Sequence, residues 1–381
     1  MKTAITARLA FTPVDVIQDP LILIEDGHIV SATSRSSTAL PANARNVDFP
    51  DAILAPGLID IHVHGGAGHD VMQAGDDALA RMETHFAAHG VTSYCPTTVT
   101  APLDDTLAAL KRLAHPGKPQ RNRAKAIGLH LEGPFISHAK RGVHPPTELR
   151  DPALDLFEKF WKAADGNIRL MTVAPELPGA SELINAATDR SVCISLGHSN
   201  ATLAEAQKGV AAGARHATHT FNAMRALDHR EPGVLGAVLA DDRITADLIA
   251  DGIHVHPEII RLFLRAKGND RAVLITDAIS ATGMGNGRFR LGGFEVEVRD
   301  DRCEFEGKLA GSVLTLDRAV RNIIEFAKWP LQHAIRLATL NPARVLGRND
   351  IGVIAPGAQA DLVVLSPERI VQRTIIQGMI D

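Results

Sequence analysis

The sequence predicts an α/β fold, a (β/α)8 TIM-like barrel with a small β-sandwich domain formed by the N- and C-terminal segments. Three observations support this fold class. The middle of the chain repeats a strand followed by a helix, the two ends contain short strand-like runs instead, and polar side chains stand where most of the middle strands end. Strands that alternate with helices form parallel sheets, and eight such units favour a closed barrel.

The small β domain is expected from residues 1–53 together with residues 350–381. The first segment alternates apolar runs with turn residues, as in ITARLAF and LILIEDGHIVSAT, where Asp26-Gly27 is typical of a hairpin turn. The second segment contains the strand-like run DLVVL. Because neither end shows the strand-helix repeat, we expect the two ends to form one domain.

The barrel is expected from residues 54–349. Helix-like stretches such as DDALARMETHFAAHG and HPEIIRLFLRAKGN are amphipathic and end in the Gly or Asn that commonly follows a helix. An open doubly wound sheet is the alternative for the same pattern. The strand-like runs are LIDIHVH (58–64), VTSYCPTT (91–98), AIGLHLEGPF (126–135), IRLMTVAPE (168–176), SVCISLGHS (191–199), ARHATHTFNA (214–223), ITADLIADGIHV (244–255) and RAVLITDA (271–278).

The composition excludes several classes of function. The net charge of −4 argues against a nucleic-acid or membrane partner held by bulk electrostatics, and 4% aromatic residues are too few for a base-stacking surface. Cys95, Cys193 and Cys303 are widely spaced and form no C-x-x-C pair, which suits a reducing compartment. No apolar run approaches the ~18 residues of a spanning helix. We therefore expect a cytoplasmic protein.

Histidine is frequent, with 17 residues, and several histidines stand at the predicted strand ends. His62 and His64 are two apart on one strand, so both side chains point to the same face and can converge on one ion. In a parallel barrel the functional residues gather where strands end. The other polar residues at these positions are Glu132, His198, His219, His254 and Asp277.

A group of imidazoles and a carboxylate without thiolates suits zinc, iron, cobalt or manganese at a catalytic site. Such an ion lowers the pKa of a water molecule towards neutrality. Asp277, in the run LITDA, is placed to accept the proton of that water. The residues alone therefore indicate metal-assisted hydrolysis.

Longer motifs resemble a known family. LAPGLIDIHVHG (54–65) resembles the opening signature of the amidohydrolase superfamily, and IGVIAPGAQADLVVL (351–365) resembles its usual C-terminal return. Within that superfamily the chain is similar, nearly end to end, to the N-acetylglucosamine-6-phosphate deacetylases. The segments that carry this second likeness are HLEGPF (130–135), RGVHPP (141–146), SLGHSNAT (195–202), THTFNAM (218–224), HREPG (229–233), DGIHV (251–255) and LITDA (274–278).

The resemblance implies metal-dependent hydrolysis of the acetamide of N-acetyl-D-glucosamine 6-phosphate, in amino-sugar catabolism and cell-wall recycling. Glu132, His198 and His219 match the family's metal ligands, with Zn²⁺ as the expected ion. Asp277 matches the catalytic acid/base, and His144 matches the histidine that polarises the acetyl carbonyl. The matched substrate-binding residues are Val143, His144, Asn222, Ala223, Arg230, His254, Leu309, Ala310 and Gly311.

The resemblance also implies a homodimer, because Arg230 matches an arginine that reaches the phosphate of a substrate bound in the neighbouring subunit. A second ion at His62 and His64, bridged through Glu132, is chemically available, and its occupancy is left open because some family members lack the histidine pair. Three alternatives remain: a sister deacetylase acting on N-acetylgalactosamine 6-phosphate, a cyclic-amide hydrolase, and a non-catalytic scaffold. Non-catalytic relatives usually lose ligands, whereas all the matched ligands are present here.

Overall fold

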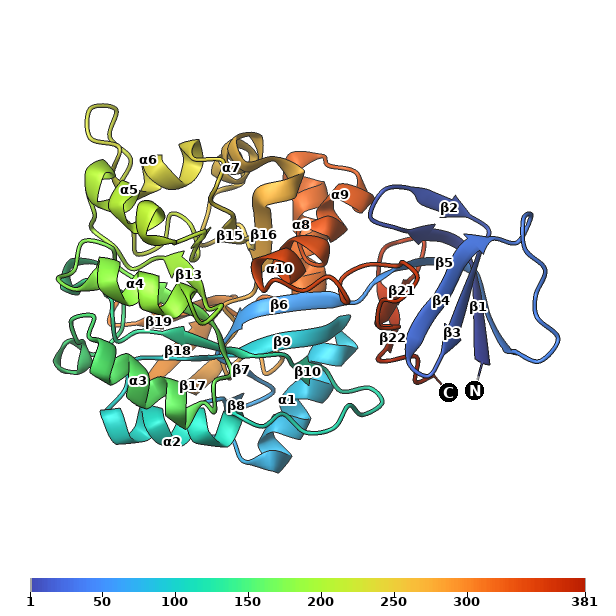
Figure 1. The fold of residues 1–381 in the computed structure, drawn as a ribbon, viewed down its shortest axis with the longest axis horizontal. Helices are drawn as coiled ribbons and strands as arrows, with labels where there is room; N and C mark the ends of the chain where they lie inside the picture. The colour runs from blue at the N-terminus through green and yellow to red at the C-terminus, as the bar shows by residue number, and fades with distance from the viewer. Residues whose placement is uncertain (1, 381) are drawn as a thin grey trace.

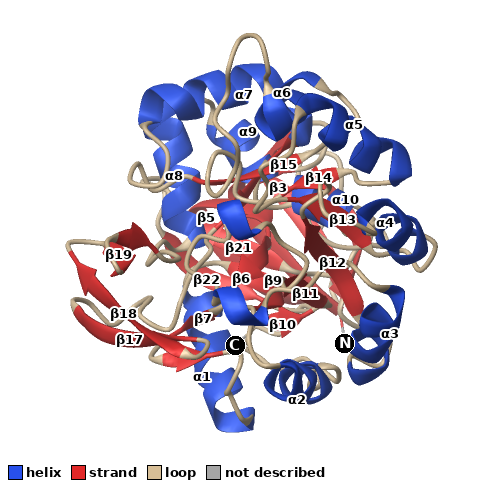
Figure 2. Ribbon diagram, turned by 90° about the vertical axis from the view of Figure 1, so that its left-hand side faces the viewer, coloured by secondary structure: helices blue, strands red, loops and turns tan. Residues whose placement is uncertain are grey.

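The computed structural model describes residues 2–380 and places a small sheet domain beside a larger barrel (Figure 1). Strands from both ends of the described chain lie on the small domain (Figure 1). The barrel occupies the middle of the chain, as the strand-helix repeat predicts. Seen along its axis, a ring of helices surrounds the strands (Figure 2).

Eight parallel strands form the barrel wall, and backbone hydrogen bonds close it. The amide of Thr220 donates to the Asp247 carbonyl at 3.0 Å, and the amide of Asp277 donates to the His62 carbonyl at 3.0 Å, which joins the last strand to the first. The predicted barrel is confirmed, and this closure excludes the open sheet. The strands are β6 (Leu58–Val63), β9 (Val91–Thr98), β11 (Leu129–Glu132), β12 (Ile168–Val173), β13 (Cys193–Leu196), β14 (His216–Ala217), β15 (Ala246–Ile249) and β16 (Ala272–Ile275).

A helix follows each barrel strand and packs its apolar face against the wall. The helix after β13 starts at a capping box, in which Thr202 and Glu205 satisfy each other's backbone amides. Across residues 2–380, no helix is long and apolar enough to cross a membrane. The helices are α1 (Asp76–Ala88), α2 (Leu103–Leu113), α3 (Leu154–Ala163), α4 (Ala180–Thr188), α5 (Leu203–Ala212), α6 (Gly233–Ala240), α7 (Pro257–Arg271), α8 (Leu316–Ala327), α9 (Leu331–Arg336) and α10 (Leu340–Val345).

Alternation along the strands explains why polar residues collect inside the barrel. In β11, Leu129 and Leu131 belong to the core cluster shared with the helices, while the alternate residues His130 and Glu132 point to the other face. His130 Nε2 lies 2.8 Å from the Thr172 hydroxyl on β12. The barrel therefore has an apolar outer layer and a polar interior.

The small domain combines strands from both ends of the chain, as predicted. Its sheet has the order β22-β21-β5-β1-β3-β4, and β2 pairs with β1. The amide of Ile29 donates to the Ala358 carbonyl, and the amide of Gly357 donates to the Ile29 carbonyl, both at 2.8 Å, so the sheet curls over its own core. The strands are β1 (Lys2–Phe11), β2 (Val16–Gln18), β3 (Pro20–Glu25), β4 (His28–Ser34), β5 (Arg45–Pro56), β21 (Leu362–Leu365) and β22 (Val371–Ile375).

A four-stranded antiparallel sheet between β16 and α8 is absent from the sequence prediction. It flanks the barrel (Figure 2) and has its own core, which includes Leu291 and Val296. The Gly292 amide at its first turn donates to Asp70 Oδ2 at 2.8 Å, which ties the turn to the barrel. Its strands are β17 (Gly287–Leu291), β18 (Phe294–Arg299), β19 (Arg302–Phe305) and β20 (Lys308–Leu309).

Short elements complete the fold. They are β7 (Gly65–Gly66), β8 (His69–Asp70), β10 (Lys125–Ala126) and 3₁₀ turns at His138–Lys140 and Pro146–Glu148.

Candidate active site

The residues predicted as metal ligands meet at the carboxyl ends of the barrel strands. His62 and His64 stand at the end of β6, Glu132 ends β11, and His198 and His219 each follow the end of their strand by two residues. All five side chains are buried. This is the end of a parallel barrel at which active sites form.

Glu132 lies at the centre of the four histidines. Its Oε1 is 3.1 Å from His219 Nε2 and 3.3 Å from His198 Nε2. The same oxygen is 3.4 Å from His62 Nε2, and Oε2 is 3.2 Å from His64 Nε2. One carboxylate therefore contacts both pairs of imidazoles.

The spacing of these atoms fits metal ligands. The residues form two groups of three, His62 with His64 and Glu132, and His198 with His219 and Glu132. Within each group, one possible ligand atom from each residue lies within 4.8 Å of the others. The His198 and His219 Nε2 atoms are 3.0 Å apart, and those of His62 and His64 are 3.2 Å apart. A tetrahedral ion with metal–nitrogen bonds of about 2.0–2.1 Å separates its ligand atoms by roughly 3.3 Å. The residues present therefore fit one divalent ion or two that share Glu132.

Backbone carbonyls orient two of the imidazoles. His64 Nδ1 donates to the Thr97 carbonyl at 3.1 Å, and His198 Nδ1 donates to the Lys140 carbonyl at 2.9 Å. A carbonyl only accepts, so Nδ1 carries a proton, and when the ring is neutral its Nε2 lone pair faces the cluster.

A buried aspartate on the neighbouring strand supports His219. The backbone of His219 is left-handed, with φ of 29°, which is strained for a residue with a side chain. Asp247, fully buried on β15, accepts a hydrogen bond from the His219 amide, and its Oδ2 accepts one from His216 Nε2 at 3.1 Å. The sequence analysis missed Asp247, because only the packing of β15 against β14 places it there.

Without a metal ion, the cluster holds protons. Burial disfavours the imidazolium of His64, but hydrogen bonds to Asp277 and Glu132 outweigh burial and raise its pKa to about 10. Burial is likewise outweighed at His219, where Glu132 raises the pKa to about 9. Two ionised carboxylates then face two imidazolium groups, an arrangement suited to exchanging protons for a cation.

Asp277 follows β16 and faces the same cluster. Its Oδ1 is 3.4 Å from His62 Nε2 and 3.3 Å from His64 Nε2. Burial opposes ionisation of this carboxyl, but His62 and a hydrogen bond to His64 outweigh burial and lower its pKa to about 2. Asp277 is therefore ionised at neutral pH and can accept a proton.

His144 lies beside Glu132 and is a neutral hydrogen-bond donor. Its Nδ1 accepts from the Thr100 amide at 3.3 Å and lies 2.7 Å from the Thr100 hydroxyl. A backbone amide only donates, so the ring proton lies on Nε2, which is 3.7 Å from Glu132 Oε2. Burial, followed by the charge of His198, lowers the pKa of His144 to about 3. No motif had indicated Thr100.

One cavity of about 230 Å³ joins the cluster to most of the predicted substrate-binding residues. We call it the inner cavity. Arg230 does not line it and stands exposed on the loop before α6. The predicted residues that line the inner cavity are His64, Glu132, Val143, His144, His198, His219, Asn222, Ala223, His254, Asp277, Leu309, Ala310 and Gly311.

His254 reaches the inner cavity from a loop, not from a strand end as expected. Strand β15 stops at Ile249, and the chain turns at Asp251. Asp251 Oδ2 accepts a 2.6 Å hydrogen bond from His254 Nδ1, and its Oδ1 accepts from the backbone amides of Ile253 and His254 at 2.8 Å. This carboxylate fixes the ring so that Nε2 is the free nitrogen.

The comparison with known families matches this geometry. Residues 53–380 match the model described as "Amidohydrolase family". The chain belongs to the amidohydrolase family. The predicted resemblance is therefore confirmed.

The amidohydrolase has close relatives along its whole length. It is 38% identical over 382 residues to N-acetylgalactosamine-6-phosphate deacetylase from Escherichia coli O157:H7, covering 100% of this chain and 99% of that protein. It is 41% identical over 346 residues to N-acetylglucosamine-6-phosphate deacetylase from Bos taurus, covering 87% and 84%. A solved structure of a mutant N-acetyl-D-glucosamine-6-phosphate deacetylase from Mycobacterium smegmatis, in complex with N-acetyl-D-glucosamine-6-phosphate, has a TM-score of 0.91 and 34% identity, and covers 99% and 98%.

Proposed function

We propose that the protein hydrolyses the acetamide of N-acetyl-D-glucosamine 6-phosphate to D-glucosamine 6-phosphate and acetate, in amino-sugar catabolism and cell-wall recycling. The observation that carries this proposal is the inner cavity, in which a metal-ligand cluster, the ionised Asp277 and the neutral donor His144 face one space. The similarity to deacetylases of sugar phosphates supports the N-acetyl group of an amino-sugar phosphate as the amide that is cleaved.

Glu132, His198 and His219 would hold a divalent ion, for which we propose Zn²⁺, and His62 and His64 would hold a second ion with Glu132. When bound, the ion polarises the acyl oxygen and makes a water molecule acidic enough to attack at neutral pH. The absence of thiolates from both groups suits a catalytic rather than a structural ion.

Asp277 and His144 divide the remaining chemistry. Asp277 accepts the proton of the attacking water as the oxygen bonds to the acyl carbon. Asp277 then returns this proton to the sugar nitrogen as the carbon–nitrogen bond breaks, which releases the amine and acetate. His144 donates its Nε2 proton as a hydrogen bond to the developing oxyanion, and its low pKa keeps the ring neutral.

The sugar phosphate would lie against Asn222, Ala223 and His254, which line the inner cavity together with residues 309–311. The chain has a net charge of −4, so phosphate binding has to be local. We propose that the protein is a homodimer in which Arg230 reaches the phosphate in the partner's cavity, because a guanidinium suits bidentate binding of phosphate.

Measurement of the acetate released tests both the proposed reaction and the identity of the substrate. Metal-free protein should be inactive, and Zn²⁺ should restore hydrolysis of N-acetylglucosamine 6-phosphate. The galactosamine epimer is the second candidate, because the relative matched over 100% of this chain carries that name. A kcat/KM at least about tenfold higher for one epimer decides between them. No acetate from either epimer with any divalent ion would overturn the proposal and favour the scaffold alternative.

Mixed dimers test the role of Arg230. Arg230→Ala should weaken hydrolysis of the phosphorylated sugar but not of unphosphorylated N-acetylglucosamine. Co-expression of Arg230→Ala with Asp277→Asn should restore activity. In a mixed two-fold dimer, one of the two sites has both an intact Asp277 and the partner's arginine. With random pairing, about a quarter of all sites are complete in this way. No recovery, or a fully active monomer by light scattering, would contradict the shared site.

We further propose a cytoplasmic location. All three cysteines are unpaired, as is usual in a reducing compartment. Fractionation of the producing cells, followed by an acetate-release assay, tests this location.

A further inference from the structure

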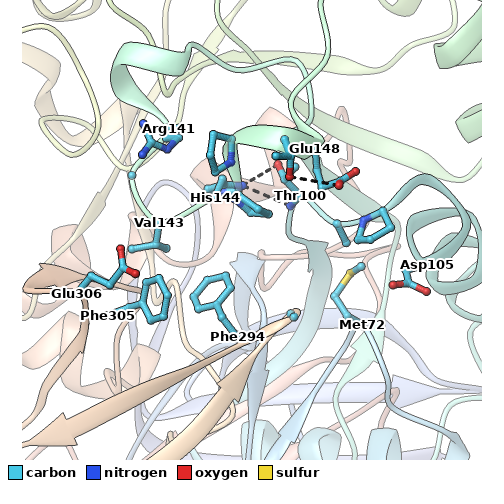
Figure 3. A pocket seen from close by; sticks show the side chains of 18 of the residues that line it. Met72, Thr100, Asp105, Arg141, Val143, His144, Glu148, Phe294, Phe305 and Glu306 are labelled. Atoms are coloured by element: carbon cyan, nitrogen blue, oxygen red, sulfur yellow. Dashed lines mark hydrogen bonds between the residues drawn. The ribbon is translucent and has the colours of Figure 1, made fainter.

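A second and larger cavity adjoins the inner cavity (Figure 3). It has a volume of about 530 Å³ and lies between the segment 141–148, the start of α2 and the β17–β20 sheet. We call it the outer cavity. Its apolar lining includes Met72, Ala101, Pro145, Phe294 and Phe305. Nothing in the proposed deacetylation of an acetyl group uses this space.

The outer cavity meets the inner cavity at the segment that contains His144. The two share Gly142, Val143 and His144, and the outer cavity has none of the residues assigned to the sugar phosphate. It therefore lies on the side of His144, the donor proposed to hold the acyl oxygen. Asn222, Ala223 and His254 line the inner cavity and not the outer cavity.

The geometry of an amide directs its acyl group towards this side. An amide is planar and trans, so the acyl carbon chain and the substituent on nitrogen point in opposite directions. With the sugar towards His254 and the carbonyl oxygen against His144, the acyl chain points away from the sugar. The outer cavity, which borders His144 and has none of Asn222, Ala223 and His254 in its lining, is the space open to a longer chain.

The lining suits an alkyl chain. The Phe294 and Phe305 rings stand 4.7 Å apart, and Val143 packs with both of them against the core of the β17–β20 sheet. Charged side chains, including those of Arg141, Glu148 and Glu306, stand around the edge (Figure 3). An apolar centre with a polar rim is typical of small-molecule sites.

The sheet wall of the outer cavity is fixed to the barrel. The Gly292 amide donates to Asp70 Oδ2 at 2.8 Å, and Gln73 Nε2 donates to the Gly292 carbonyl at 3.1 Å. Asp70 is buried and also accepts from the Met72 amide at 2.7 Å. The sheet wall of the outer cavity is therefore held against the segment that contains Asp70 and Gln73.

We propose that the outer cavity is an acyl subsite, which lets the enzyme remove N-acyl groups longer than acetyl, namely straight apolar chains such as butanoyl and hexanoyl, from hexosamine 6-phosphates. This proposal rests on the proposed function. Hydrolysis of these amides has the same stoichiometry as that of the acetamide. Water adds to the acyl carbon, the carbon–nitrogen bond breaks, and a carboxylate and an amine are released.

A substrate series tests the subsite. N-acetyl-, N-butanoyl- and N-hexanoylglucosamine 6-phosphate are compared by release of the free amine. Because each methylene buried in the subsite contributes up to about fourfold in binding, kcat/KM for the longer substrates should fall no more than about tenfold below the acetyl value. A fall of more than about 100-fold for both longer chains, with acetyl hydrolysed, would overturn the subsite. Failure with the acetyl substrate as well would instead overturn the proposed function.

A substitution that fills the outer cavity separates the subsite from an entry path. Gly293 lines only the outer cavity, and a Cβ built on it meets no atom within 4 Å. Gly293→Phe should leave acetyl hydrolysis within about twofold and lower hexanoyl kcat/KM by at least about tenfold. Gly117→Phe, at a glycine that is equally open but lines neither cavity, should change neither value. An equal loss for all chain lengths in Gly293→Phe would mean an entry path and would overturn the proposal.

Discussion

Binding of a divalent ion should release protons from His219 and His64. In the metal-free protein their pKa values are about 9 and about 10, so both rings are protonated at pH 7.5. A metal ion binds only the lone pair of a neutral imidazole, so each protonated ligand has to lose its proton first.

The structure gives the number of protons for each ion. His219 belongs to the group with Glu132 and His198, and His64 belongs to the group with Glu132 and His62. Each ion therefore displaces one proton held by the cluster. Below pH 9, the apparent dissociation constant of each ion should fall about tenfold for each unit rise in pH.

Calorimetry in buffers of different ionisation enthalpy measures this release directly. Wild-type protein titrated with Zn²⁺ at pH 7.5 should release at least one proton with the first ion and another with the second. His64→Gln should lose the second release and keep the first. His115→Gln, at an exposed histidine outside the cluster, should behave as wild type. A release near zero in the wild type would refute the protonated cluster.

Four further outcomes are expected. Asp277→Asn should keep the fold and metal content but lower kcat by about 10³-fold, measured by acetate release with elemental analysis as the control. The pKa values of His64 and His219 in the folded, metal-free protein lie above the ordinary 6.5, so these protonated rings stabilise the fold fully below pH 6.5. This stabilisation is lost as the pH rises to 9–10, and the melting temperature of the metal-free protein should fall over that range. A melting temperature that does not change with pH would contradict this. Thr202→Ala removes the capping box with Glu205 and should cost about 1 kcal/mol in urea unfolding, with no change in kcat. Gly133→Ala places a Cβ 1.9 Å from the Thr100 hydroxyl at a φ of +75°. This should displace Thr100, the hydrogen-bond partner of the His144 ring, and lower kcat by about 10²-fold at unchanged metal content. Normal activity of the variant would show that His144 does not depend on the position of Thr100.

The barrel and its ligands could be predicted from sequence because both follow local rules. Alternation of apolar and polar residues marks a strand with one face towards the helices, as in β11, and Gly or Asn marks the helix ends. Parallel strands that close into a barrel bring their carboxyl ends together, which is why Glu132, His198 and His219 meet although 87 residues separate the first from the last.

The supporting residues could not be predicted in this way. Thr100, Asp247 and Asp251 act through contacts that depend on how neighbouring loops and strands pack. Thr100 and Asp247 lie in none of the motifs, and the motif DGIHV contains Asp251 without indicating its contact with His254. The β17–β20 sheet is different. Its run FEVEVR alternates as a strand should, but its position beside the barrel depends on the distant partner Asp70. The strand β15 also ends earlier than its apolar pattern suggests, which moves His254 onto a loop.

Closure of the barrel has a consequence for the order in which the nascent enzyme becomes active. Both ligand groups are complete once residue 219 has been synthesised, whereas Asp277 arrives with the eighth strand. The amides of Asp277 and His64 form the hydrogen bonds that join this strand to the first, to the His62 and Ala278 carbonyls. The last seam of the barrel and the proposed proton acceptor are therefore completed in a single event. On the proposed mechanism, a partly folded chain that has bound an ion should hydrolyse no amide until that seam closes.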